Sequence, residues 1–254
     1  MSISDEGIMA LVHSPYLTRL RYLDIENCDA TFYGIHTLVQ ASNFQDIEEL
    51  HLGELFMSVE DGELFLGCEE KMGFDDFQAL LSGRHIQKVH SLECEKLTFK
   101  QLAFLTEEVL HPMIRTLELD EGSFGDEGVL LLANCPQIAN LERLSLIDCE
   151  LGDIGAKAIA ESPYLGKLSE LQLCNNHIGD LGIEALATSQ NLLQLLHLDL
   201  EDNQVGFIGA MAIANSRIFT LLEELDLEDN EIGQKGVRIV EDSRRLENLE
   251  AFWY

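Results

Sequence analysis

The chain has 254 residues, with 16 Lys and Arg against 46 Asp and Glu, and a formal net charge of −30 at pH 7. This balance repels nucleic acid phosphates and anionic membranes, and it favours basic partners. A hydrophobic content of 46% argues against a disordered chain. The segment from Met1 to Leu20 has early acidic residues and no long apolar run, so the sequence predicts neither a signal peptide nor a membrane-spanning helix.

A repeat of 27 residues dominates the C-terminal half of the chain. Three segments align without gaps: LSELQLCNNHIGDLG from Leu168, LLHLDLEDNQVGFIG from Leu195 and LEELDLEDNEIGQKG from Leu222. Each follows the pattern L-x-x-L-x-L-x-x-N-x-I/V-G-x-x-G. This spacing and this period are typical of a leucine-rich repeat.

Units of this kind extend over the chain as a single domain, 1–254, with eight full repeats. The repeats begin near residues 20, 47, 89, 114, 141, 168, 195 and 222. Partial repeats flank them, because Ile3 to Gly7 matches the second half of a unit and Leu249 begins a ninth unit. The open ends of such an array predict either a longer natural chain or pairing with a second copy as a homodimer.

One unit is longer than the others. The unit from Ile47 takes 42 residues to reach the next, 15 more than the usual 27, and the insertion lies at about 56–73. It contains Asp61-Gly62 between alternating apolar residues, which predicts a β-hairpin. An insertion on one loop of a solenoid is either a partner contact or a tolerated loop, and the sequence favours neither.

Each unit predicts a short strand followed by a helix. The L-x-x-L-x-L run alternates apolar and polar residues, so one face of the strand is buried. Asn176, Asn203 and Asn230 end their strands, where an amide can satisfy backbone groups of the turn. Asp153 and Asp180 then suit the N-caps of the helices. The predicted fold is α/β, a right-handed solenoid or horseshoe with parallel strands on the concave face and helices on the convex face.

The helical half of the unit resembles a known subtype. The I-G-D-x-G-x-x-A-(L/I)-A-x-S portion, at Gly152 to Ser162 and Gly179 to Ser189, resembles the ribonuclease-inhibitor type of leucine-rich repeat. Ribonuclease inhibitors, Ran GTPase-activating proteins and the sensor regions of some immune receptors share this type. The Ser-Pro-Tyr-Leu at Ser14 to Leu17 and Ser162 to Leu165 resembles arrays in bacterial proteins. The resemblance implies binding by the concave face.

The concave face is expected to be acidic. Strand alternation places three residues of each unit there, and thirteen of these 24 are Asp or Glu, whereas 46 acidic residues among 254 would put about four at 24 positions. Because neighbouring strands lie about 4.8 Å apart, such rows repel one another, and stability alone does not favour them. The predicted partner-binding residues are Asp24, Glu26, Glu49, Glu93, Glu95, Glu118, Asp120, Glu170, Asp199, Glu201, Glu224, Asp226, Glu228 and Trp253.

We therefore expect a non-enzymatic module that binds a basic protein through this face, with no nucleic acid or membrane as partner. Three readings stay open beside it: a merely solvated acidic surface, a regulator of a GTPase or another enzyme, and the sensor or scaffold part of a longer chain or of a secreted bacterial effector. Trp253 is either an aromatic anchor or a residue that packs on a further unit.

Signals of catalysis or cofactor binding do not appear in the sequence. No Ser-His-Asp arrangement, phosphate-binding loop or zinc motif is present, and His51 and His197 are too far apart in the array to share a metal. The sequence therefore predicts no enzyme activity, no cofactor and no metal site. Six cysteines without CxxC spacing indicate a reduced, cytoplasmic protein.

Overall fold

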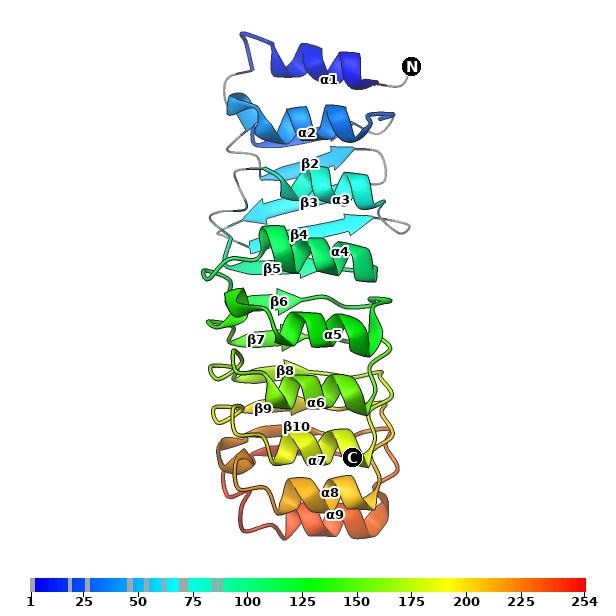
Figure 1. Cartoon of the computed structure of the whole chain (residues 1–254), viewed down its shortest axis with the longest axis vertical. Coiled ribbons are helices and arrows are strands. Elements are labelled where there is room, and N and C mark those ends of the chain that lie inside the picture. Colours follow the sequence, from blue (N-terminus) through cyan, green and yellow to red (C-terminus); the bar gives the residue numbers. More distant parts are fainter. Residues whose placement is uncertain are drawn as a thin grey trace.

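The protein was analysed as a computed structural model that describes residues 3–17, 20–25, 28–44, 48–52, 55–60, 63–68, 73–83, 86 and 89–254. Strand–helix units follow one another in chain order along the long axis of the molecule (Figure 1). The helices form one layer that covers one face of a single sheet (Figure 1). This arrangement confirms the predicted α/β solenoid.

The elements alternate regularly from α4 onward. The strands are β1 (Tyr22–Ile25), β2 (Glu49–Leu52), β3 (Leu55–Glu60), β4 (Glu63–Cys68), β5 (Ser91–Cys94), β6 (Thr116–Glu118), β7 (Arg143–Ser145), β8 (Glu170–Gln172), β9 (His197–Asp199), β10 (Glu224–Asp226) and β11 (Ala251–Trp253). The α-helices are α1 (Asp5–Val12), α2 (Phe32–Gln40), α3 (Phe74–Leu81), α4 (Phe99–Phe104), α5 (Gly125–Ala133), α6 (Asp153–Glu161), α7 (Asp180–Ala187), α8 (Phe207–Ala214) and α9 (Gly233–Glu241). Short 3-10 turns are η1 (Ser42–Phe44), η4 (Pro136–Ile138) and η5 (Phe219–Leu221), and η3 (Leu105–Val109) is a π-helical turn. Within these described residues, no helix combines the length and the apolar character that crossing a membrane requires.

The sheet has eleven strands, and their spatial order follows their order in the chain. Neighbouring strands are parallel, except that β3 is antiparallel to both β2 and β4. The predicted hairpin is therefore confirmed, although its turn at Asp61-Gly62 lies outside the described residues. The expected place of the insertion, on a loop, is wrong, because β3 and β4 are two further strands of the sheet (Figure 1). Leu64 of β4 lies opposite Leu92 of β5, so the apolar alternation of the insertion continues the core of the repeats.

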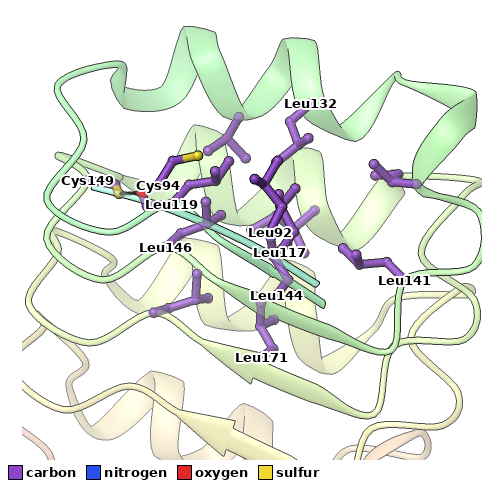
Figure 2. Close-up of a cluster of buried hydrophobic side chains, with 14 of the residues drawn as sticks. Leu92, Cys94, Leu117, Leu119, Leu132, Leu141, Leu144, Leu146, Cys149 and Leu171 are labelled. Carbon is purple, nitrogen blue, oxygen red and sulfur yellow. Dashed lines mark hydrogen bonds between the residues drawn. The ribbon is translucent and has the colours of Figure 1, made fainter. Parts of the chain in front are cut away.

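The core lies between the sheet and the helix layer. The residues at the second and third leucine positions of the pattern point into it, as the labelled side chains of Figure 2 show for the units that begin at residues 89, 114 and 141. Leu144 and Leu146 are 1% and 0% exposed. Full burial of such a side chain stabilises the fold by about 1.5–3 kcal/mol. Cys94 occupies a leucine position and is equally buried.

An asparagine after the strand links consecutive units at Asn176, Asn203 and Asn230. Asn176 Oδ1 accepts hydrogen bonds from the backbone N–H groups of Cys149 at 3.1 Å and Leu151 at 2.9 Å, both in the preceding unit. Its Nδ2 donates to the carbonyl oxygen of Leu146 at 2.8 Å. Asn203 makes corresponding bonds in the next unit. The prediction that this amide satisfies the backbone of the turn is confirmed.

The aspartates that begin α6 and α7 have a different role from the predicted one. Asp153 and Asp180 do not cap their own helices, because the N-caps of α6 and α7 are Gly152 and Gly179, without a side-chain bond. Instead, Asp153 Oδ1 accepts from the N–H groups of Gly179 at 2.8 Å and Gly182 at 2.9 Å. The helices stack side by side, so a carboxylate in the first turn of one helix reaches the free N–H groups at the start of the next.

We expect Asp180→Ala to lower the free energy of unfolding by about 2–3 kcal/mol, because buried N–H groups that lose a charged acceptor are costly. Its Oδ1 accepts from Gly206 at 2.8 Å and from Gly209 at 2.7 Å. Denaturation in urea measures the change. Asp242→Ala is the matched control, because this exposed side chain forms no hydrogen bond or ion pair with the described residues, and we expect a change within about 0.5 kcal/mol. Equal losses of unfolding free energy in the two variants would contradict the claim that Asp180 stabilises the contact between units.

Candidate functional site

We call the face of the sheet that the helices leave uncovered the open face. It is the face that the sequence predicts to be concave and acidic. In β8, Leu171 is buried in the core, whereas Glu170 and Gln172 on either side of it are partly exposed on the open face. The predicted residues that lie in strands of this face are Asp24, Glu49, Glu93, Glu118, Glu170, Asp199, Glu224, Asp226 and Trp253. Glu95, Asp120, Glu201 and Glu228 lie one or two residues beyond strand ends. Glu26 lies outside the described residues.

The register of the sheet brings carboxylates opposite one another. Glu93 of β5 pairs with Glu118 of β6, and Asp199 of β9 pairs with Asp226 of β10. Burial raises the pKa of Glu93, and the charges of Glu118 and Glu95 raise it further. The fold therefore holds these carboxylates closer together on the open face than they would lie in free solution.

Arg143 neutralises the middle of the open face. Its guanidinium lies 2.6 Å from a carboxylate oxygen of Glu170 on β8 and 3.7 Å from one of Glu118 on β6. Burial raises the pKa of Glu118, while the charge of Arg143 acts in the opposite direction. Two of the predicted partner-binding carboxylates thus already have a positive partner within the protein.

Asp120 has a structural role in the same region. Its Oδ1 accepts hydrogen bonds from Ser145 Oγ at 2.7 Å and from the backbone N–H of Ile147 at 2.9 Å, both in the next unit. These bonds satisfy polar groups where β7 ends, so this carboxylate contributes to the link between units.

The C-terminal part of the open face keeps its charge. We call Asp199, Glu201, Asp226 and Glu228 the C-terminal acidic cluster. Asp199 Oδ1 accepts from the N–H of Glu201 at 3.0 Å, and Asp226 Oδ1 accepts from the N–H of Glu228 at 2.8 Å. Among the described residues, no Lys or Arg forms an ion pair with any of the four.

Two carboxyl groups of this cluster, Asp199 and Glu201, have raised pKa values. Burial raises the pKa of Asp199; the hydrogen bond from the Glu201 backbone lowers it and the charge of Asp226 raises it. The pKa of Glu201 is raised by desolvation and then by the charges of Asp226 and Asp199. Uncompensated carboxylates of this kind suit an incoming positive group.

The hairpin adds a row of aromatic rings that the repeat pattern does not single out. His51 of β2 lies opposite Phe56 of β3, with ring centroids 4.5 Å apart, and Phe56 lies 5.4 Å from Phe65 of β4. Tyr22 of β1 extends the row at 6.0 Å from His51. The alternation of the insertion contained the signal for Phe56 and Phe65, but only its placement within the sheet puts both on the open face.

Two of the cavities in the described part of the molecule differ in their position relative to the predicted site. The larger, about 640 Å³, lies beside the helix layer, where Phe32 and His36 of α2, Leu81 of α3 and residues around His111 line it. The smaller, about 120 Å³, lies on the open face over β8 to β11. Asp199, Asp226 and Trp253 are among its lining residues, so it is the cavity that coincides with the predicted site.

Cys174 lies beside the C-terminal acidic cluster. Its Sγ, a carboxylate oxygen of Asp199 and one of Glu201 all lie within 4.8 Å of one another. Burial, followed by the charges of Asp199 and Glu201, raises the pKa of the Cys174 thiol to about 12. Without a bound cation the thiol is therefore protonated at neutral pH, so it adds no negative charge to the carboxylates beside it.

A family model described as "Leucine Rich repeat" matches residues 137–160, 167–187, 194–214 and 220–238. Each matched segment contains one strand of the sheet and most of the helix that follows it. The chain is a leucine-rich repeat protein. Proteins of this class generally act by binding other proteins on the extended surface of the repeat array. The resemblance to the ribonuclease-inhibitor type stays a prediction.

Comparison with solved structures gives likeness of shape only. An internalin (inlF) from Listeria monocytogenes is 18% identical with a TM-score of 0.49, and the match covers 92% of this chain and 66% of the internalin chain. A pollen receptor kinase 3 is 17% identical with a TM-score of 0.39, covering 70% of this chain and 78% of that one. The chain thus spans 66% of the length of the internalin. No curated protein sequence is significantly similar to the chain.

We expect the protein to become more stable as the pH falls from 7 toward about 4.5, near the ordinary range of carboxyl pKa values. Because the pKa values of Glu93 and Glu201 are raised, the folded chain binds protons that the unfolded chain releases at the same pH. The resulting stability is complete below the unfolded pKa values and is lost as the pH rises through the raised folded values. Thermal unfolding at low salt measures this trend.

The control for the pH dependence is the double variant Glu93→Gln and Glu201→Gln. This variant removes two of the carboxyl groups whose pKa values are raised, so its Tm should change less with pH than the Tm of the unmodified protein. A Tm that rises with pH between 4.5 and 7 in the unmodified protein would contradict the crowding of carboxylates on the open face.

Proposed function

We propose that this protein is a non-enzymatic interaction module whose open face binds a basic protein. The observation that carries the proposal is the C-terminal acidic cluster, which has no Lys or Arg partner among the described residues. Asp24, Glu49, Glu93 and Glu95 extend the acidic surface toward the N-terminal end. The partner class follows from charge, since such a surface attracts positive groups and repels phosphates and anionic lipid.

The energetics support a binding role over mere solvation. Two unit charges 4 Å apart interact by about 1 kcal/mol in water and by more near a protein surface. Asp199 and Asp226 lie opposite each other on adjacent strands, so the folded protein carries this repulsion permanently. Positive side chains of a partner would remove the repulsion, and the relief adds to the affinity. Charge also steers the encounter, which makes association fast and sensitive to salt.

The absence of an enzymatic role is part of the proposal. A general acid and a general base need carboxylates in contrasting environments inside a water-excluding pocket. Asp199 and Glu201 instead have pKa values raised in the same direction by the same causes, on an open sheet. A cytoplasmic location is proposed as well, because Cys28, Cys94, Cys135, Cys149 and Cys174 are free thiols, which suits a reducing compartment.

Charge reversal on the two faces of the molecule tests the proposal. The open-face variant changes Asp199, Glu201, Asp226 and Glu228 to Lys. The helix-side variant changes four exposed carboxylates, Glu127, Glu161, Glu184 and Glu241, to Lys, and so alters the net charge by the same amount. We expect proteins captured from a native lysate at about 50 mM salt to be released by about 300 mM salt, since screening weakens such contacts.

The open-face variant should capture at least tenfold less protein from the lysate than the unmodified protein does. The helix-side variant should capture nearly as much as the unmodified protein. Circular dichroism of both variants checks that they fold. Equal losses in the two variants would show that the effect comes from net charge alone, and capture that survives in the open-face variant would place the binding site elsewhere. Either result contradicts the proposed function.

A further inference from the structure

The open-face cavity is built at the junction of β9, β10 and β11. Asp199, Asp226 and Trp253 stand opposite one another in successive strands, so the indole lies one strand away from Asp226 and two strands away from Asp199. Glu224 lines the same cavity from the neighbouring position of β10. One wall is therefore an aromatic ring, and the adjoining wall is made of carboxylates.

Three of the carboxylates in this cavity lack a positive partner. Asp199 and Asp226 each use Oδ1 for a backbone N–H, which leaves Oδ2 without a hydrogen bond to a described residue. Glu224 forms neither a hydrogen bond nor an ion pair within the described part of the chain. Glu170, at the far side of the cavity, differs because Arg143 holds it at 2.6 Å. The unmatched charge thus lies next to the indole.

The size of the cavity limits what enters it. Its volume is about 120 Å³. This is well below the roughly 300–1,000 Å³ of a pocket for a drug-sized ligand, so it suits the head group of one side chain. Trp253 is 43% exposed, so part of this side chain is accessible to such a group.

We propose that this cavity binds the guanidinium group of one arginine of the partner, stacked on the indole of Trp253 and paired with Asp226. The inference rests on the proposed function, because the arginine belongs to the basic protein that the open face binds. Tryptophan is the best aromatic partner for a cation, and a planar guanidinium stacks on it while its edge pairs with a carboxylate. A lysine ammonium lacks the planar fork and keeps more of its hydration, so it fits the cavity less well.

Trp253 is the single tryptophan of the chain, so its fluorescence reports on this cavity without labelling. The probe is a six-residue peptide with a central arginine between lysines, titrated at about 20 mM salt. Two matched peptides replace the arginine by citrulline, which has the same shape without charge, or by lysine. We expect a saturable change in indole emission with the arginine peptide and at least fivefold weaker binding of both replacements.

Two variants separate the cavity from the general charge of the face. Asp226→Asn and Glu201→Gln each remove one negative charge from the C-terminal acidic cluster, but only Asp226 lines the cavity. Asp226→Asn keeps an oxygen that can accept from the Glu228 N–H, so the turn stays intact. We expect Asp226→Asn to lower the affinity for the arginine peptide at least tenfold. Glu201→Gln should lower this affinity no more than threefold. Trp253→Ala should lower the affinity for the arginine peptide at least fivefold, as measured by calorimetry.

The outcomes distinguish this inference from the proposed function. Salt-sensitive capture of basic protein with no difference between the arginine and citrulline peptides would overturn the arginine cavity and leave the proposed function standing. Equal affinity for the lysine and arginine peptides would also overturn it. An arginine-specific change of Trp253 emission, combined with no capture of any basic protein, would support the cavity and contradict the proposed function.

Discussion

Consecutive repeats are held in register by polar side chains that bond the backbone of a neighbouring unit. Asn176 and Asn203 do so at the ends of strands, Asp153 does so at the starts of helices, and Ser189 Oγ donates to the carbonyl oxygen of Ala160 at 2.6 Å on the return segment. The units around α6 and α7 are thereby fixed to their neighbours at the strand end, the helix start and the return segment. The strand register follows, and the register decides which side chains stand opposite one another on the open face.

The same register imposes a cost on the acidic face. Asp199 and Asp226 are held opposite each other, and burial together with neighbouring charge raises the pKa of Asp199. Arg143 relieves the middle of the face by pairing with Glu118 and Glu170, whereas the C-terminal acidic cluster receives no such relief from the described residues. The protein thus concentrates unmatched charge at one end of its sheet, next to Trp253, where we propose that an arginine of the partner binds.

The local sequence pattern was sufficient to predict the buried leucines and the role of the asparagines at the strand ends. Alternation along the strands identifies the buried leucines, and an amide at the strand end has few other roles than bonding the turn. Asp153 is different, because its target is the next helix, and the distance between helices does not follow from the spacing within one unit. The position of Phe56 and Phe65 also could not be predicted from the sequence, because an alternating hairpin has the same pattern whether it projects from the sheet or joins it. The pairing of Arg143 and the cavity beside Trp253 depend on side-chain positions across three or more strands.

Carboxyl footprinting of the protein, alone and with a basic protein that it captures, is the most direct test of the proposal that the open face is the binding surface. In this measurement, a water-soluble carbodiimide couples an amine to accessible carboxylates, and mass spectrometry reads the extent at each residue. We expect the partner to protect Asp199, Asp226 and Glu228 and to leave Glu127 and Glu184 on the helix side unchanged. Protection of the helix-side carboxylates with unchanged labelling of the open face would contradict this assignment.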